Sequence, residues 1–228
     1  MQIAERIQTV QQYIRQLEKN YDREPNSVRL IAVSKGQTYQ AIQLAYNEGL
    51  CDFGENYLQE ALIKINKLSS LPLNWHFIGA IQSNKTQAIA ENFSWVHSIS
   101  RLKIAEKLSH ERSGLQSDLN VCIQINLDNE ESKSGISPDL AIDLAKNIMQ
   151  LPRLCLRGLI VIPKPKTNEE QYITFSRATQ LLHEINKSLN INLDTLSMGM
   201  SEDLAAAIRA GSTMVRVGRS IFGERYQS

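Results

Sequence analysis

The chain has 228 residues, with 25 Lys and Arg against 24 Asp and Glu, so its formal net charge is +1, and 42% of its residues are hydrophobic. This composition is typical of a globular protein and gives no overall field that would favour nucleic acid or an anionic membrane surface. The three cysteines, Cys51, Cys122 and Cys155, are too few and too scattered for a disulfide framework or a zinc site, which predicts a reducing compartment.

The chain alternates between short apolar strands and amphipathic helices. It opens without the basic region and apolar block of a signal peptide, and no apolar run approaches the ~18 residues of a membrane span, so we expect a cytoplasmic protein. Apolar residues at helical spacing between Ile3 and Leu17 predict an extra N-terminal helix on the outside of the fold. The predicted strands, in chain order, are 30–33, 51–54, 74–79, 94–100, 119–127, 156–162, 194–199 and 213–218.

Helical patterns follow each of these strands. They lie at 39–47, 58–68, from about 84, from about 101, 141–151, 175–189, 202–209 and 220–222. Eight strand–helix units in about 200 residues predict an α/β protein with a parallel sheet, closed into a single (β/α)8 TIM barrel. The alternative is an open, doubly wound sheet. No linker long enough to separate a second domain is present, so we expect one domain over 1–228.

The residues that follow the strands suggest where the chemistry lies, because a (β/α)8 barrel carries its active site at the C-terminal ends of its strands. Lys35 stands two residues after the apolar strand Leu30–Val33, and Asn56 follows the second strand. A lysine has an unperturbed pKa of ~10.4, and burial lowers that pKa and exposes a nucleophilic lone pair. The position therefore favours Schiff-base chemistry with an aldehyde, the alternative being an ordinary lysine on a surface loop.

Two glycine–serine turns predict a phosphate site on the same rim. Residues Gly199–Ser201 and Gly218–Ser220 follow the seventh and eighth strands, where barrels often bind phosphate at the start of a short helix. The alternative is that Ser201 and Ser220 merely cap helices. A lysine facing a phosphate site suggests an aldehyde that carries a phosphate, either pyridoxal 5′-phosphate or a sugar phosphate.

Five segments together resemble one family. They are "AVSKGQ", "FGENYLQE", "WHFIGAIQSNK", "ESKSGI" and "LSMGMSEDLAAAIRAGSTMVRVGRSIFG". From about Val28 to Gly223 the chain is similar to the YggS/PROSC family of pyridoxal phosphate homeostasis proteins, which itself resembles the barrel domain of alanine racemase (fold type III). The departures are mild: "GLIVIPKP" replaces a more usual methionine-containing segment, and "VRVG" replaces the commoner "VRIG".

The resemblance implies a cofactor and a role for each residue. Pyridoxal phosphate would be held as a Schiff base on Lys35, with Asn56 at its phenolic oxygen and Arg216 at its pyridine nitrogen. Ser201, Gly218 and Arg219 would hold the phosphate, and Met198 and Gly199 would line the same pocket. The alternative for Arg216 is a salt-bridged core residue, because an arginine inside so apolar a strand is costly unless it is paired or functional.

The family has no established catalytic reaction and is thought to buffer the cofactor or to deliver it to apo-enzymes. Arginine is always charged and only donates, so Arg216 would disfavour protonation of the pyridine nitrogen and weaken the ring as an electron sink. Racemisation also needs a second acid/base, which alanine racemases take from an extra β-domain that this chain is expected to lack. We therefore expect a carrier without substantial turnover, and a monomer. The alternatives are a slow amino-acid racemase or a Schiff-base aldolase.

Two further features carry weaker predictions. The four histidines, His76, His97, His110 and His183, lack metal-ligand spacing, and His76 is expected either in the barrel interior or in the wall of the site. Lys133, in the loop "NEESKSG", is expected on a solvated charged loop or, alternatively, at a second, low-affinity cofactor contact.

Overall fold

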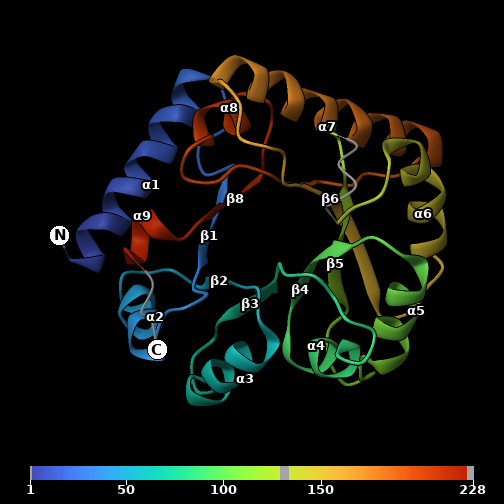
Figure 1. The fold of residues 1–228 in the computed structure, drawn as a ribbon, viewed down its shortest axis with the longest axis horizontal. Helices are drawn as coiled ribbons and strands as arrows, with labels where there is room; N and C mark the ends of the chain where they lie inside the picture. The colour runs from blue at the N-terminus through green and yellow to red at the C-terminus, as the bar shows by residue number, and fades with distance from the viewer. Residues whose placement is uncertain (1, 129–133, 225–228) are drawn as a thin grey trace.

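The computed structural model describes residues 2–128 and 134–224. Within these residues, eight parallel strands form one sheet in the order β1 to β8, and β1 pairs with β8 to close the barrel (Figure 1). The strands are β1 Arg29–Val33, β2 Asp52–Glu55, β3 Asn74–Phe77, β4 Trp95–Ile99, β5 Leu119–Ile125, β6 Leu154–Val161, β7 Thr195–Ser197 and β8 Met214–Val217. The closure confirms the predicted (β/α)8 barrel and excludes the open, doubly wound sheet.

Helices surround the barrel and cover the outer face of the sheet (Figure 1). They are α1 Ile3–Asn20, α2 Tyr39–Asn47, α3 Leu58–Lys67, α4 Thr86–Asn92, α5 Leu102–Glu111, α6 Ala141–Ile148, α7 Asn168–Leu189, α8 Leu204–Arg209 and α9 Arg219–Phe222, with a 3-10 turn at Pro138–Leu140. The predicted N-terminal helix is present as α1, which buries Ile7, Val10, Ile14 and Leu17 and packs beside α2, α8 and α9.

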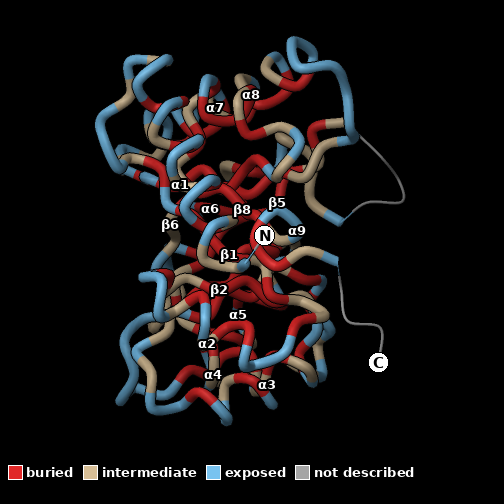
Figure 2. The backbone as a smooth tube through the Cα atoms, turned by 90° about the vertical axis from the view of Figure 1, so that its left-hand side faces the viewer, coloured by how far each residue is buried: buried red, intermediate tan, exposed pale blue. Residues whose placement is uncertain are grey.

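The core has two parts because each strand presents alternate residues to opposite faces. The larger part lies between the sheet and the helices, and buried residues run through the middle of the molecule (Figure 2). A small apolar cluster that includes Ile31, Trp95 and Met214 is separate from it. Short, almost continuously apolar strands are expected of a parallel sheet covered on both faces. None of the helices in the described ranges is both long and apolar enough to cross a membrane.

Several element boundaries differ from those that the sequence pattern predicts. Helix α7 begins at Asn168, ahead of its apolar repeat, because Thr167 and Glu170 form a capping box that extends the helix. Strand β7 ends at Ser197 rather than Gly199, since Gly199 has a φ of +98° and cannot continue a strand. Helix α8 begins at Leu204 rather than Glu202.

Candidate functional site

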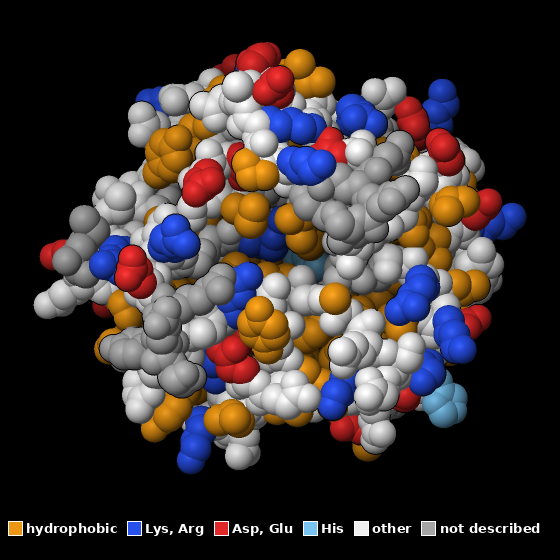
Figure 3. Space-filling view, in the orientation of Figure 1, with side chains coloured by type: hydrophobic (Ala, Val, Ile, Leu, Met, Phe, Trp, Pro, Cys, Tyr) orange, Lys and Arg blue, Asp and Glu red, His pale blue; other side chains and the backbone are white. Residues whose placement is uncertain are grey.

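The barrel brings several of the predicted site residues to one rim. Strand β1 pairs with β2 on one side and β8 on the other, in the registers Val33↔Gly54 and Ala32↔Val217. Lys35, Asn56 and Gly218, which follow these three adjacent strands, therefore leave the sheet at the same edge. The molecular face in Figure 3 is hollowed at its centre, where Lys or Arg side chains and a histidine are visible inside the depression.

The residues on both sides of Lys35 donate hydrogen bonds to carboxylates. The Ser34 hydroxyl donates to Glu55 Oε1 over 2.6 Å, and the backbone N–H of Gly36 donates to Glu60 Oε1, also over 2.6 Å. Ser34 is fully buried and Lys35 is half-buried. The loop that carries Lys35 is thus fixed through its neighbours, which restricts where the amine can lie.

A second lysine completes this support. Lys64 Nζ lies 2.7 Å from Glu55 Oε1 and 2.5 Å from Glu60 Oε1, and it donates to the carbonyl oxygen of Ser34 over 2.7 Å. Burial raises the pKa of Glu55, and the charge of Lys64 opposes that rise. The only sequence signal for this cluster is the Glu60–Lys64 spacing on α3, so sequence reasoning missed it.

Asn56 carries an unmet hydrogen-bonding group. Its Oδ1 atom is buried and has no hydrogen-bond partner within residues 2–128 and 134–224. The backbone of Gly79 packs closely against Asn56 and requires glycine there, because a Cβ at Gly79 would lie 2.1 Å from the Asn56 carbonyl oxygen. A buried amide oxygen without a partner is costly, and here it is an acceptor available to a ligand.

The turn after β7 is shaped by Gly199. The positive φ of this residue, together with a distance of only 2.5 Å from a built Cβ to Ala207 Cβ, requires glycine there. Met198, just before it, is fully buried, and the Gly199 carbonyl oxygen accepts from the backbone N–H of Arg216 over 3.0 Å. The ends of β7 and β8 are therefore joined beside Arg216.

The two serines do not cap helices as the capping alternative predicted. Ser201 lies in the turn before α8, whose N-cap is Asp203, and Asp203 Oδ1 accepts from the backbone N–H of Met200. Ser220 is the second residue of α9, whose N-cap is Gly218, and Arg219 is exposed at the start of that helix. Short turns lead into both helices, so the first-turn N–H groups lack partners within the helix itself.

Arg216 lies inside the barrel with a side chain that donates to Ser197 Oγ over 2.9 Å and to the Val161 carbonyl oxygen over 3.2 Å. It is 4% exposed, and burial lowers its pKa to about 10, which leaves the guanidinium charged at neutral pH. In the described part of the chain no carboxylate lies within 4 Å of it. The salt-bridged alternative for Arg216 is therefore not what the structure shows.

His76 lies in the barrel interior, the first of its two predicted positions. Its Nε2 is 3.0 Å from Asp52 Oδ1, and its Nδ1 is 3.0 Å from His97 Nε2. Both rings are fully buried. His97 was singled out by sequence only for its lack of metal spacing, and its place beside His76 was missed.

Other regions are less informative. Lys133 lies outside the described residues. Among the residues that are described, no group of three or more His, Cys, Asp or Glu could hold a metal ion.

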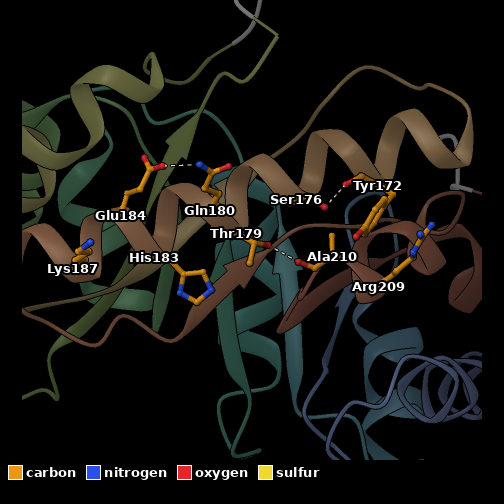
Figure 4. Close-up of a pocket in the computed structure, with 9 residues that line it drawn as sticks. All are labelled: Tyr172, Ser176, Thr179, Gln180, His183, Glu184, Lys187, Arg209 and Ala210. Atoms are coloured by element: carbon orange, nitrogen blue, oxygen red, sulfur yellow. Dashed lines mark hydrogen bonds between the residues drawn. The ribbon is translucent and has the colours of Figure 1, made fainter.

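An open groove of about 550 Å³ runs along α7 and the end of α8, where the Arg209 guanidinium lies 3.8 Å from the centroid of the Tyr172 ring (Figure 4). This groove lies on the outside of the barrel, away from Lys35.

The closed barrel, with a lysine after β1 and an arginine in β8, defines a class of protein: residues 6–226 match the family described as "Alanine racemase, N-terminal domain". An alanine racemase from Clostridium difficile has the same fold, with a TM-score of 0.72 over 96% of this chain and 57% of that one, at 14% identity.

The chain belongs to the family of pyridoxal phosphate homeostasis proteins within this class. It is 52% identical to the pyridoxal phosphate homeostasis protein of Pseudomonas aeruginosa, over 98% of this chain and 96% of that protein. It is 47% identical to that of Haemophilus influenzae, over 100% and 98%. The solved structure of PipY from Synechococcus elongatus with PLP bound has a TM-score of 0.86 at 36% identity, over 97% of this chain and 100% of PipY.

Proposed function

We propose that this protein binds pyridoxal 5′-phosphate covalently on Lys35 and serves the homeostasis of that cofactor. The observation that carries the proposal is the buried Asn56 amide oxygen, which has no hydrogen-bond partner among the described residues and lies just after β2, the strand that pairs with β1 before the Lys35 loop. A bound ligand can supply the donor that this oxygen lacks, and the NH2 of the same amide can donate to a phenolic oxygen. PipY, solved with PLP bound, and the relatives named pyridoxal phosphate homeostasis proteins support the same conclusion.

The residues on the rim fit the parts of this cofactor. When bound, pyridoxal phosphate supplies an aldehyde that reacts with primary amines and a ring that withdraws electrons. Lys35 would bind the aldehyde carbon, Asn56 the phenolic oxygen, and Arg216 the pyridine nitrogen. The phosphate would be bound by Ser201, Gly218 and Arg219, beside a wall formed by Met198 and Gly199. The charged state of Arg216 fits a ring nitrogen that accepts a hydrogen bond and stays unprotonated.

The same arrangement favours a carrier over an enzyme. An unprotonated ring nitrogen weakens the electron-withdrawing chemistry on which amino-acid racemisation depends. Binding needs only the lysine and the phosphate contacts. We further propose that the protein acts as a cytoplasmic monomer that buffers the cofactor or hands it to apo-enzymes. A slow amino-acid racemase is the second candidate, favoured by the fold shared with alanine racemases.

Removing the phosphate from the ligand is expected to weaken binding at least a hundredfold. Charge-assisted hydrogen bonds contribute ~1.5–3 kcal/mol each, so the loss of two or three of them lowers the affinity at least about a hundredfold. The measurement is a titration of the protein with pyridoxal and with pyridoxal 5′-phosphate, followed by visible absorption. Near-equal affinities would exclude a phosphate site at the turns after β7 and β8.

The cofactor-loaded protein is expected not to exchange the Cα proton of L-amino acids at a useful rate. The reason is the charged Arg216, which keeps the ring nitrogen unprotonated and so weakens the ring as an electron sink. The measurement is incubation with single L-amino acids in deuterated water, followed by NMR and chiral analysis. Exchange faster than about one per second, in the range of ordinary enzymes, that disappears in Lys35→Ala would show that the protein is an enzyme.

A further inference from the structure

A continuous series of hydrogen bonds crosses the interior of the barrel and ends at Arg216. We call it the interior hydrogen-bond chain; its members are Asp52, His76, His97, Ser197 and Arg216. The four links are 3.0 Å from Asp52 Oδ1 to His76 Nε2, 3.0 Å from His76 Nδ1 to His97 Nε2, 2.9 Å from His97 Nδ1 to Ser197 Oγ, and 2.9 Å from Ser197 Oγ to Arg216 Nη1. His97 is on β4 and Ser197 on β7, which are not neighbours in the sheet, so this link spans the barrel.

The chemistry of the two ends fixes the direction of every link. An ionised Asp52 only accepts, so His76 carries its hydrogen on Nε2 and offers a lone pair on Nδ1 when neutral. His97 must then donate from Nε2 and accept at Nδ1, where the Ser197 hydroxyl donates. At the other end Arg216 only donates, which leaves Ser197 Oγ as its acceptor. Both ends therefore require the same arrangement, in which every link is satisfied.

Most of the interior hydrogen-bond chain is buried, and this burial sets the protonation states of its histidines. His76 and His97 are fully buried, whereas Asp52 at the start of β2 keeps a side-chain exposure of 17%. Burial lowers the pKa of both histidines, so both rings are neutral at neutral pH, as the directions above require. Asp52 places a negative charge at one end of the chain, and Arg216 a positive charge at the other. In a medium of low dielectric constant, successive hydrogen bonds of one direction strengthen one another.

Other charged and aromatic groups lie beside the interior hydrogen-bond chain. The centroid of the Trp95 ring is 5.7 Å from that of the His97 ring, and the charge of Asp203 acts on Arg216. At the Asp52 end, Arg29 Nη1 lies 3.8 Å from Asp52 Oδ1, and the ring of Trp95 stacks on His76 with centroids 5.5 Å apart. The Arg157 guanidinium lies over the Trp95 ring, 5.2 Å from its centroid. The Arg216 guanidinium has the Ser197 hydroxyl and the Val161 carbonyl oxygen as its acceptors. Its orientation therefore depends on Ser197, and through Ser197 on the two histidines.

We propose that Asp52, His76, His97 and Ser197 are positioning residues, which together orient the Arg216 guanidinium toward the ring nitrogen of the bound cofactor. This inference rests on the proposed function, since it assumes that pyridoxal phosphate occupies the rim above Arg216. It assigns a role in cofactor binding to two fully buried histidines of the barrel interior.

The test compares matched variants loaded with pyridoxal phosphate labelled with ¹⁵N at the ring nitrogen. Ser197→Ala and His97→Leu interrupt the chain, Ser197→Thr keeps the hydroxyl, and Ser109→Ala removes a buried hydroxyl of α5 that donates to the Pro152 carbonyl oxygen outside the chain. The readouts are the ¹⁵N chemical shift, the affinity for the cofactor and the midpoint of urea unfolding.

Interrupting the chain is expected to move the ¹⁵N resonance toward that of a pyridine without a hydrogen bond and to weaken affinity about tenfold, the effect of one lost hydrogen bond. Ser197→Thr and Ser109→Ala should match the wild type. If the interrupted variants do not fold, Asp52→Asn, at the more exposed end, should shift the resonance in the same direction by less. Unchanged ¹⁵N shifts and affinities in folded variants would overturn the inference, whereas a wild type that does not bind the cofactor would overturn the proposed function itself.

Discussion

Replacement of Lys35 by alanine is expected to abolish covalent binding of pyridoxal phosphate while leaving the barrel folded. Lys35 is half-buried, and the surrounding loop is held through Ser34 and Gly36 rather than through the Lys35 side chain alone. The loss should therefore be chemical, with little effect on structure. The measurement is visible absorption of the protein mixed with cofactor, followed by borohydride reduction and denaturation to detect cofactor that stays attached.

Lys67→Ala provides the matched control, because Lys67 is an exposed lysine on α3. It should retain the full absorption band and the full yield of reduced product. Circular dichroism of both variants checks that the fold is intact. A Lys35→Ala protein that still retains cofactor after borohydride reduction would show that another lysine is the anchor.

Replacement of Lys64 by methionine is expected to lower the free energy of unfolding by about 3–5 kcal/mol at neutral pH. The change leaves Glu55, which is fully buried, without the cation that lies 2.7 Å away. Removing one partner of a buried ion pair has an effect of this size, because the remaining charge stays desolvated. The measurement is urea unfolding of the variant and of Lys67→Met, which changes an exposed lysine on the same helix and should be near neutral.

The loss of unfolding free energy in Lys64→Met is expected to grow as the pH rises. Burial raises the pKa of Glu55, and without Lys64 the rise is unopposed. The folded variant therefore binds a proton on Glu55 more tightly than the unfolded chain does, so its deficit is smallest below the ordinary pKa of a glutamate, ~4.3, and grows as the pH rises through neutrality. A stability difference from the wild type that does not change between pH 5 and pH 8 would contradict this account of the cluster.

The sequence allows the barrel to be predicted because its elements are locally specified. The short apolar run Leu30–Val33 is typical of a buried strand, the spacing of apolar residues from Ile3 to Leu17 is typical of a helix, and the structure has these elements there. The start of α7 was predicted late, although the capping box from Thr167 to Glu170 is a local signal that could have placed it.

The supporting groups of the site could not be predicted in this way. Lys64 meets Ser34 and Glu55 only after α3 folds back over β1 and β2, and the Glu60–Lys64 spacing is equally typical of an exposed pair. His97 and Ser197 are 100 residues apart and meet across the barrel interior. Such contacts depend on the closure of the sheet, which local patterns do not encode.

Mapping the attachment site of the cofactor tests the central proposal most directly. The wild-type protein is loaded with pyridoxal phosphate, reduced with borohydride and digested, and its peptides are sequenced by mass spectrometry. We predict one modified site, Lys35, at a stoichiometry that approaches one per chain. Attachment at another lysine, or at many lysines to low and similar extents, would contradict the proposal that this rim of the barrel is a cofactor site built around Lys35.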